Sequence, residues 1–269
     1  IKEFMKYSLI DPTLFDMLLV GILFFLTLIL SVRESVNLEK QLIIGSLRTI
    51  FQLIMIGYII EYIFHLNRWY IVLLALSFMV LVATQTATAR QKKKIKGLFG
   101  LMGFSIFLGT LITTFIVTFV VLKIDPWYSP AYLLPLAGMI LGNSMNSAAI
   151  AGERFYSELH SRLQQVETLL ILGHDFKFAC ATAKREAVKA AMVPTLNSMM
   201  TVGLVALPGM MTGQILAGAN PVLATKYQII VMLMIASTVT VTSVIFVNLS
   251  MRRYFSKGQQ IKKYLFNDN

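Results

Sequence analysis

Cysteine, histidine and acidic residues are scarce in this chain of 269 residues, which has one Cys, three His and 13 Asp plus Glu. A lone cysteine, Cys180, excludes an internal disulfide and a cysteine metal cluster, and three histidines leave little for a zinc site. We therefore expect Cys180 to be a small packing residue. The sequence identifies no metal-ligand set, and we expect the chain itself to bind no cofactor.

Catalytic motifs are missing as well. The chain contains no G-x-x-x-x-G-K-[ST] phosphate loop, no H-E-x-x-H zinc motif and no G-x-S-x-G nucleophile turn. Glu153 and Glu186 have no visible acid–base partner. These absences argue against an enzyme, and against ATP binding through a phosphate loop of this chain.

Charge is also sparse, because only 14% of residues are charged while 57% are hydrophobic, and the mean hydropathy is +0.71. A soluble domain usually carries about 25% charged residues. The apolar runs are near-continuous rather than alternating, which favours membrane helices over a barrel. The sequence begins at Ile1 rather than Met, so we base no prediction about targeting, for or against, on its first residues. The composition predicts an all-α integral membrane protein.

Seven apolar stretches reach the roughly 20 residues that a membrane span needs. We treat residues 1–269 as a single transmembrane permease domain. The expected spans are Leu14–Val32, Leu42–Phe64, Trp69–Ala89, Leu98–Leu122, Tyr132–Ala151, Met192–Leu216 and Tyr227–Leu249.

The net charge of +11 lies mostly in the connectors between these stretches. With the N-terminus outside and the C-terminus in the cytoplasm, cytoplasmic connectors hold eighteen of the 24 Lys and Arg. That asymmetry follows the positive-inside rule and removes the need for a nucleic-acid partner. We predict this orientation and a multi-pass location in the cell membrane.

Residues 153–191 form a polar segment between the fifth and sixth predicted spans. Apolar side chains from Phe155 to Leu170 recur at spacings of three and four, as on one face of a helix. Gly173 supplies a left-handed helix stop, and Asp175 is a good N-cap for a second helix beginning at Phe176. We expect a cytoplasmic helix-turn-helix. It could lie on the bilayer surface or insert into a groove of a partner protein.

The sixth predicted span is interrupted at Pro208, which lacks an N–H and clashes with the preceding turn. In lipid such a break is tolerated only where it lines a protein-buried or water-filled cavity. Thioether and oxygen ligands follow it. The alternative is a kink relieved by Thr212, with the methionines filling the core. The pathway candidates at the break are Pro208, Met210, Met211, Thr212 and Gln214.

Other intramembrane polar groups and methionines extend this candidate pathway. Polar side chains in a bilayer also serve as contacts between helices. Arg48 is costly in a membrane and therefore a functional candidate, unless it snorkels to the cytoplasmic surface. The further candidates are Arg48, Gln52, Asn143, Met145, Asn146, Asn197 and Met199.

Two small-residue motifs fit close helix approach. They are Gly138-x-x-x-Gly142 in the fifth span and Gly209-x-x-x-Gly213 in the sixth. They predict that these spans pack against each other or across a dimer axis.

Two resemblances bear on these segments. Glu167-Thr-Leu-x-x-x-Gly173 resembles the first half of the EAA-x-x-x-G coupling loop of ABC transporter permeases. The second half, Ile-x-Leu-Pro, is absent, since Ala183, Arg185 and Glu186 stand there. In such subunits the loop rests in a cleft of a separate ATPase. The resemblance implies coupling residues at Arg162, Glu167, Leu170, Gly173, Asp175 and Arg185.

Nearly the whole chain resembles the Fet-type iron-export ABC permeases, whose plant relatives are linked to aluminium tolerance. The matching segments are RTIFQLIMIGY (Arg48–Tyr58), GMILGNSMNS (Gly138–Ser147), PTLNSMMTVGLVALPGMMTGQILAGANP (Pro194–Pro221) and YQI (Tyr227–Ile229). The resemblance implies a homodimeric membrane subunit exporting iron, a related metal or its chelate. ATP and Mg would bind the partner ATPase.

Three other functions stay open from the residues alone. A stand-alone channel or secondary transporter predicts no ATPase partner. A membrane-embedded enzyme needs a catalytic group that the sequence does not display. A scaffold or sensor would use residues 153–191 for signalling only.

Overall fold

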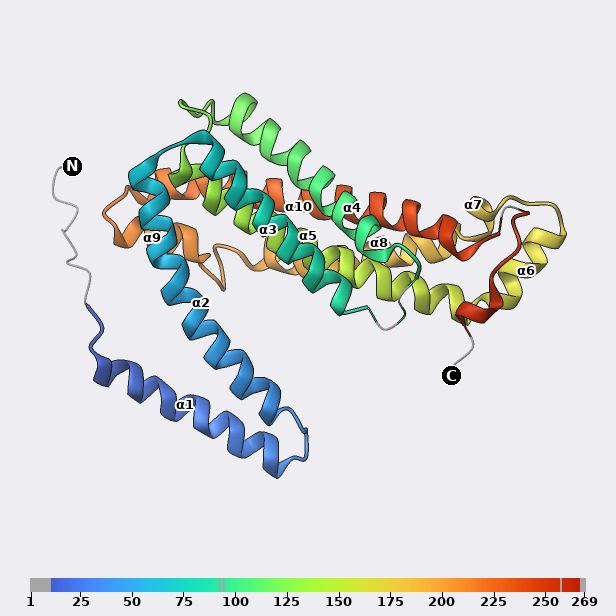
Figure 1. The fold of residues 1–269 in the computed structure, drawn as a ribbon, viewed down its shortest axis with the longest axis horizontal. Helices are drawn as coiled ribbons and strands as arrows, with labels where there is room; N and C mark the ends of the chain where they lie inside the picture. The colour runs from blue at the N-terminus through green and yellow to red at the C-terminus, as the bar shows by residue number, and fades with distance from the viewer. Residues whose placement is uncertain (1–10, 92, 94, 257, 267–269) are drawn as a thin grey trace.

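A computed structural model describes residues 11–91, 93, 95–256 and 258–266 of the protein. Of the basic residues used for the predicted orientation, Lys92, Lys94 and Lys257 lie outside the described residues, as do residues 1–10 of the predicted outer N-terminus. Figure 1 shows a helical protein whose long helices run side by side. The helices are α1 (Leu14–Arg33), α2 (Glu39–Leu66), α3 (Trp69–Ala89), α4 (Leu98–Phe115), the π-helix η1 (Ile116–Val121), α5 (Pro130–Ser161), α6 (Leu163–Ile171), α7 (Phe176–Ala179), α8 (Ala181–Thr201), α9 (Gly209–Leu216), α10 (Pro221–Met251) and the short 3₁₀ helices η2 (Arg252–Tyr254) and η3 (Lys263–Leu265).

Local sequence signals account for the helix ends. The hydroxyl of Thr13 accepts a hydrogen bond from the Asp16 amide, and the Asp16 carboxylate accepts one from the Thr13 amide, which makes a capping box before α1. At α10 the Asn220 side chain caps the Val222 amide at 2.8 Å, and Pro221 occupies the first helical position. These caps supply partners for amides that the helices leave unpaired.

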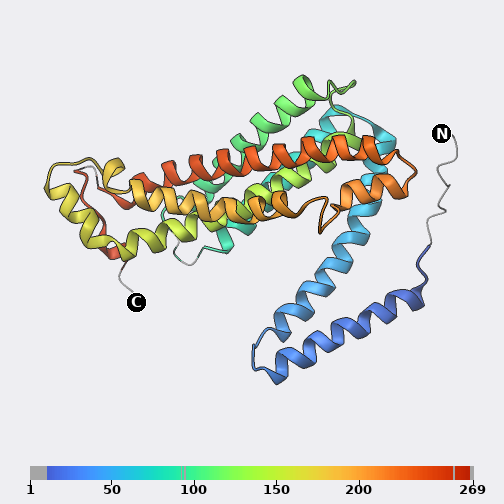
Figure 2. The same ribbon diagram turned by 180° about the vertical axis from the view of Figure 1, so that it is seen from behind.

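The long helices divide into a bundle and a projecting hairpin. Helices α3, α4, α5, α8 and α10 pack together, whereas α1 and α2 extend away from them (Figures 1 and 2). No residue in the most apolar window of α2 is buried inside the chain. A helix that is apolar on all sides suits lipid or another protein rather than water.

Six helices in the described part of the chain are long and apolar enough to cross a membrane. They cover six of the seven predicted spans. The exception is Met192–Leu216, where α8 ends at Thr201 and α9 begins only at Gly209. The prediction of an all-α membrane protein is confirmed, and the sixth predicted span is replaced by two helices with an irregular connection. The orientation of the termini stays a prediction.

Small and hydroxylated residues hold the bundle core together. A side-chain carbon added at Gly109 of α4 would overlap the Thr242 hydroxyl of α10. The Thr242 hydroxyl lies 3.4 Å from that of Ser144 on α5, and both residues are fully buried. Close backbone approach of this kind drives helix association in membranes, where apolar burial cannot.

Gly152 of α5 is the second point of close contact, and it yields a stability prediction. A side-chain carbon there would lie 2.5 Å from the Gln91 amide oxygen and 2.8 Å from the Phe246 ring. We expect Gly152→Val to destabilise the fold by about 1–3 kcal/mol, because overpacking forces neighbours out of place. Thermal unfolding of the purified chain measures this loss. Gly57→Val on α2 is the control, since nothing lies within 4 Å of that position.

The two predicted glycine motifs do not mark close contacts inside the chain. A side-chain carbon added at Gly138 would lie 3.4 Å from the Met79 side chain of α3, but one added at Gly142, Gly209 or Gly213 would meet nothing within 4 Å. Helices α5 and α8 do pack against each other, as predicted for the fifth and sixth spans, but these three glycines do not make that contact within the chain. Their role across a dimer axis stays a prediction. The contacts instead fall at Gly109 and Gly152, where the opposing side chains were not visible from spacing.

Candidate functional site: a broken span and a distant helical segment

The connection between α8 and α9 is irregular over residues 202–208. Gly203 adopts a left-handed conformation, with φ at +82°, and its amide donates to the Ala206 carbonyl at 2.9 Å. Pro208 is the N-cap of α9, and Pro194 lies inside α8 without ending it. The predicted break exists, but it begins at Val202 rather than at Pro208. The backbone becomes extended at Val202, directly after the last residue of α8, and Pro208 caps the start of α9.

Two adjoining cavities lie at this break, with volumes of about 390 and 410 Å³. Helices α5, α8, α9 and α10 supply the walls of the first, and α8, α9 and α10 those of the second. None of the described residues that line them is charged. Five methionines line the pair of cavities, namely Met139, Met199, Met210, Met211 and Met232.

Gln228 of α10 lines both cavities and is only 6% exposed. Its amide oxygen is buried and has no hydrogen-bond partner among the described residues. The amide oxygen of Gln214 on α9 is also buried and also has no hydrogen-bond partner among the described residues. An unsatisfied buried acceptor costs about 1–3 kcal/mol, so its presence beside a cavity points to a ligand that completes it.

Sequence reasoning missed Gln228, Met139 and Met232. Gln228 is the one carboxamide in an otherwise apolar stretch around Tyr227–Ile235. A polar side chain in a membrane helix was the available signal. Met139 and Met232 carry no such signal, because a methionine in a span is usually core filler.

The structure gathers part of the predicted pathway at the cavities. Asn143 and Met210 line the first cavity, while Met199 and Met211 line the second. The Thr212 hydroxyl donates to the Pro208 carbonyl at 3.1 Å, as the alternative of a relieved kink expects. Pro208 itself lines the first cavity.

Other predicted pathway residues lie elsewhere. The Asn146 side chain accepts a hydrogen bond from Arg90 at 2.7 Å, and Met145 packs against the main core. Asn197 is exposed on α8. Arg48 and Gln52 are exposed on α2, which projects from the bundle, so the chain does not bring them to the cavities (Figure 1). Helical spacing could not show that α2 leaves the bundle.

Residues 153–191 form the far end of the bundle. Helix α5 is continuous to Ser161, and the backbone bends at Arg162, whose guanidinium lies 3.0 Å from the buried Glu158 carboxylate. The predicted helix stop is present at Gly173, with φ at +89°, and the Asp175 carboxylate caps the Phe178 amide at 2.8 Å. The predicted second helix is divided at Cys180 into α7 and α8. Its location in the cytoplasm stays a prediction.

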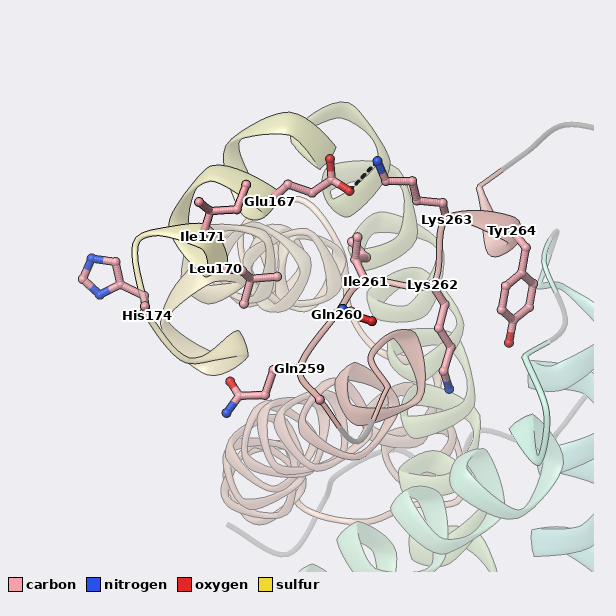
Figure 3. A pocket seen from close by; sticks show the side chains of 12 residues that line it. Glu167, Leu170, Ile171, His174, Gln259, Gln260, Ile261, Lys262, Lys263 and Tyr264 are labelled. Carbon is pink, nitrogen blue, oxygen red and sulfur yellow. Dashed lines mark ion pairs between the residues drawn. The ribbon is translucent and has the colours of Figure 1, made fainter.

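A groove of about 990 Å³ separates α6 from the C-terminal tail. Figure 3 shows Glu167 and Lys263 reaching toward each other, and their charged atoms lie 2.8 Å apart. Leu170 and Gly173 line the groove, and the Gln259 side chain accepts a hydrogen bond from the Phe176 amide at 3.2 Å. The tail thus ties the end of α10 to the segment around Gly173.

Aromatic stacking strengthens this attachment. The Phe266 ring stacks on Tyr156 of α5 at 5.5 Å and lies 5.8 Å from Tyr254. At the tip of the segment, by contrast, Ile171 and Leu172 are 85% and 69% exposed. The segment is therefore held firmly on its inner side and presents apolar side chains on its outer side.

Arg185 does not share this surface. It is exposed on α8 and lines a different groove, against α10. Proximity in sequence to Gly173 was misleading, because the turn at Gly173 and the bend at Cys180 redirect the chain.

Cys180 is fully buried, and burial raises the pKa of its thiol to about 12. This agrees with the predicted packing role. Only the thiolate reacts, so a rise from 9.0 to about 12 lowers the reactive fraction about a thousandfold. We expect maleimide to label the native protein very slowly and the denatured protein fully. Thr182→Cys with Cys180→Ala is the control, since residue 182 is exposed; equally fast labelling of native wild type would contradict the buried thiol.

The chain is 42% identical to the UPF0014 membrane protein slr1647 of Synechocystis over 85% of this chain and 88% of that protein. It is 35% identical to the Protein ALUMINUM SENSITIVE 3 of Arabidopsis thaliana over 91% and 88% of the two chains. It is 34% identical to the Probable iron export permease protein FetB of Escherichia coli over 87% and 89%. No solved structure matches.

The predicted resemblance to Fet-type permeases is thereby confirmed. The match to the family covers residues 14–255, which include every predicted span, the irregular connection at residues 202–208 and the segment of residues 153–191. The chain belongs to the family described as Uncharacterised protein family (UPF0014), and it is a multi-pass membrane protein.

Proposed function

We propose that this chain is the permease subunit of an ATP-driven exporter whose energy comes from a separate ATPase docking on residues 153–191. The observation that carries the proposal is the continuity of α8. This helix begins within the segment of residues 153–191, at Ala181, and ends at the cavities, at Thr201. With a rise of 1.5 Å per residue it spans about 30 Å without interruption.

Helix α5 provides a second rigid connection. It contributes Met139 and Asn143 to the cavity wall and continues to Ser161, inside the segment of residues 153–191. A displacement of α6 and α7 would therefore move two walls of the cavities together. The irregular connection at residues 202–208 would absorb the change, since loops at helix ends are the usual hinges.

The exposed tip of the segment is the proposed contact with the ATPase. Ile171, Leu172 and Phe178 present apolar side chains around the Gly173 turn. A short helical element with exposed apolar residues fits a groove on a partner. In this proposal the tip faces the cytoplasm, the N-terminus lies outside, and ATP and Mg bind the partner. Two copies of the chain would assemble with two ATPases.

The cargo is proposed from the relatives and from the cavity lining. One relative is named as a probable iron export permease. Thioethers are soft ligands and carboxamide oxygens are hard ones, but both are uncharged and bind weakly, which suits passage of a divalent metal better than its storage. Because none of the described lining residues is charged, an iron or related metal ion would cross the cavities hydrated or as a chelate rather than bare.

The methionines offer a test of cargo selectivity. If thioethers contact the metal, Met210→Leu with Met211→Leu should shift the preference among Fe²⁺, other divalent ions and metal chelates several-fold, with little change in stability. Leucine and methionine have similar volumes, so the swap usually costs under about 1.5 kcal/mol. Flux of each metal into reconstituted vesicles measures the preference. Unchanged selectivity would make the two side chains packing residues.

Copurification tests the ATPase partnership directly. Tagged chain, extracted from native membranes in mild detergent, should retain an ATPase subunit and stimulate its hydrolysis of ATP. A stand-alone channel or secondary transporter would purify without an ATPase and carry metal at the same rate with or without ATP. That result would overturn the proposal.

A further inference from the structure

A basic groove of about 810 Å³ runs between α8 and α10, apart from the cavities at the broken span. Five cationic side chains line it, and none of its described lining residues is acidic. They come from α7, α8 and η2, so three separate elements converge on one site. The five are Lys177, Lys184, Arg185, Lys189 and Arg252.

Most of this charge is uncompensated. Lys189 lies 3.0 Å from the Glu186 carboxylate, and that hydrogen bond lowers the pKa of Glu186. The other four cations make no ion pair with any described residue. Like charges gathered in one groove repel each other, so the arrangement favours an anion between them.

The groove has an apolar wall as well as a basic rim. Lys184, Val188 and Met192 follow each other at spacings of four on α8, and therefore lie on one face. Val244 and Met251 of α10 line the same groove, and the Thr240 hydroxyl contacts the Met192 sulfur at 3.5 Å near its inner end. The groove thus offers both cationic side chains and an apolar wall to one ligand.

We propose that this groove binds an anionic phospholipid of the surrounding bilayer. The phosphate would lie among Lys184, Arg185 and Arg252, with the upper part of an acyl chain along Val188, Met192 and Val244. Basic pockets between membrane helices bind lipid head groups in this manner. A soluble anion would leave the apolar wall uncovered. The proposal depends only on the groove, and it holds whether or not an ATPase drives the protein.

The test uses the full chain, purified in detergent and mixed with phosphatidylglycerol or with phosphatidylcholine, with lipid retention measured by native mass spectrometry. Wild type should retain phosphatidylglycerol preferentially. Each lost cation should weaken retention about fivefold, so Lys184→Gln with Arg252→Gln should weaken it about 25-fold. Arg33→Gln with Lys40→Gln, at exposed cations of the α1–α2 connection, should change nothing. Lys184→Arg with Arg252→Lys keeps both positive charges and should retain phosphatidylglycerol as well as wild type does.

Several outcomes would overturn this assignment. Equal retention of the two lipids by wild type would exclude an anionic-lipid site. Undiminished retention of phosphatidylglycerol by the variant with Lys184→Gln and Arg252→Gln would exclude it as well. Displacement of phosphatidylglycerol by inorganic phosphate at equal concentration would indicate a site for soluble anions. Loss of ATPase binding in the Gln variant, with lipid retention intact, would assign the groove to a partner protein instead. Lys177→Gln alone provides a milder variant if the double substitution lowers the yield of folded protein.

Discussion

Gln228→Leu is expected to lower transport roughly tenfold to a hundredfold while making the protein no less stable. A hydrogen bond to a charged group contributes about 1.5–3 kcal/mol, and the Gln228 amide oxygen is the buried acceptor that a cargo would complete. Leucine of similar size removes that acceptor and the cost of leaving it unpaired. Flux of Fe²⁺ into vesicles and thermal unfolding of the same preparation measure the two effects.

The opposite signs of these effects distinguish a cargo contact from a packing role. If Gln228 only supported the fold, the substitution would lower stability and transport together. Gln85→Leu is the matched control, because Gln85 is an exposed glutamine of α3 that lines neither cavity. Full transport by Gln228→Leu would remove this residue from the pathway.

Gly173→Trp is expected to uncouple the ATPase from the permease. Gly173 has φ at +89°, a conformation that costs an L-residue about 1–2 kcal/mol. That penalty alone would lower the population of the native turn about tenfold. In addition, the indole would occupy the apolar tip at the groove of Figure 3. ATP hydrolysis by the reconstituted complex, compared with the ATPase alone, measures the loss of stimulation.

Gly218→Trp controls for backbone strain. Gly218 also has a left-handed φ, at +90°, and like Gly173 has nothing within 4 Å of an added side-chain carbon. It follows α9, at the opposite end of the molecule from the turn (Figure 1). ATPase stimulation should survive there. Normal stimulation by Gly173→Trp would show that the turn does not transmit the ATPase motion.

Features set by short-range chemistry were predictable from the sequence. The helix stop at Gly173 depends on the backbone freedom of glycine, and it is present. The cap at Asp175 depends on a carboxylate that accepts a hydrogen bond from a nearby backbone amide, and it is present as well. Six spans could be recognised because each needs only length and apolarity. The break in the remaining span was predicted from proline, although α8 already ends at Thr201, before the chain reaches Pro208.

Features set by the meeting of distant segments were not predictable. Gln228 becomes a site residue only because α10 lies beside the end of α8, and Arg185 leaves the proposed docking surface because the chain bends at Cys180. Arg48 was a candidate through its depth in a span, but α2 carries it away from the bundle. Periodicity fixes which face a residue occupies and contains no information about which helix lies opposite.

The coupling of ATP hydrolysis to metal movement is the central claim, and one transport measurement tests it. Vesicles are prepared with the permease and its copurified ATPase. The exposed tip around Ile171 and Leu172, with the ATPase bound to it, faces the outer medium. Adding ATP and Fe²⁺ outside should load Fe²⁺ into the lumen, and a non-hydrolysable ATP analogue should not. Equal Fe²⁺ entry without ATP, or with the permease alone, would contradict the account.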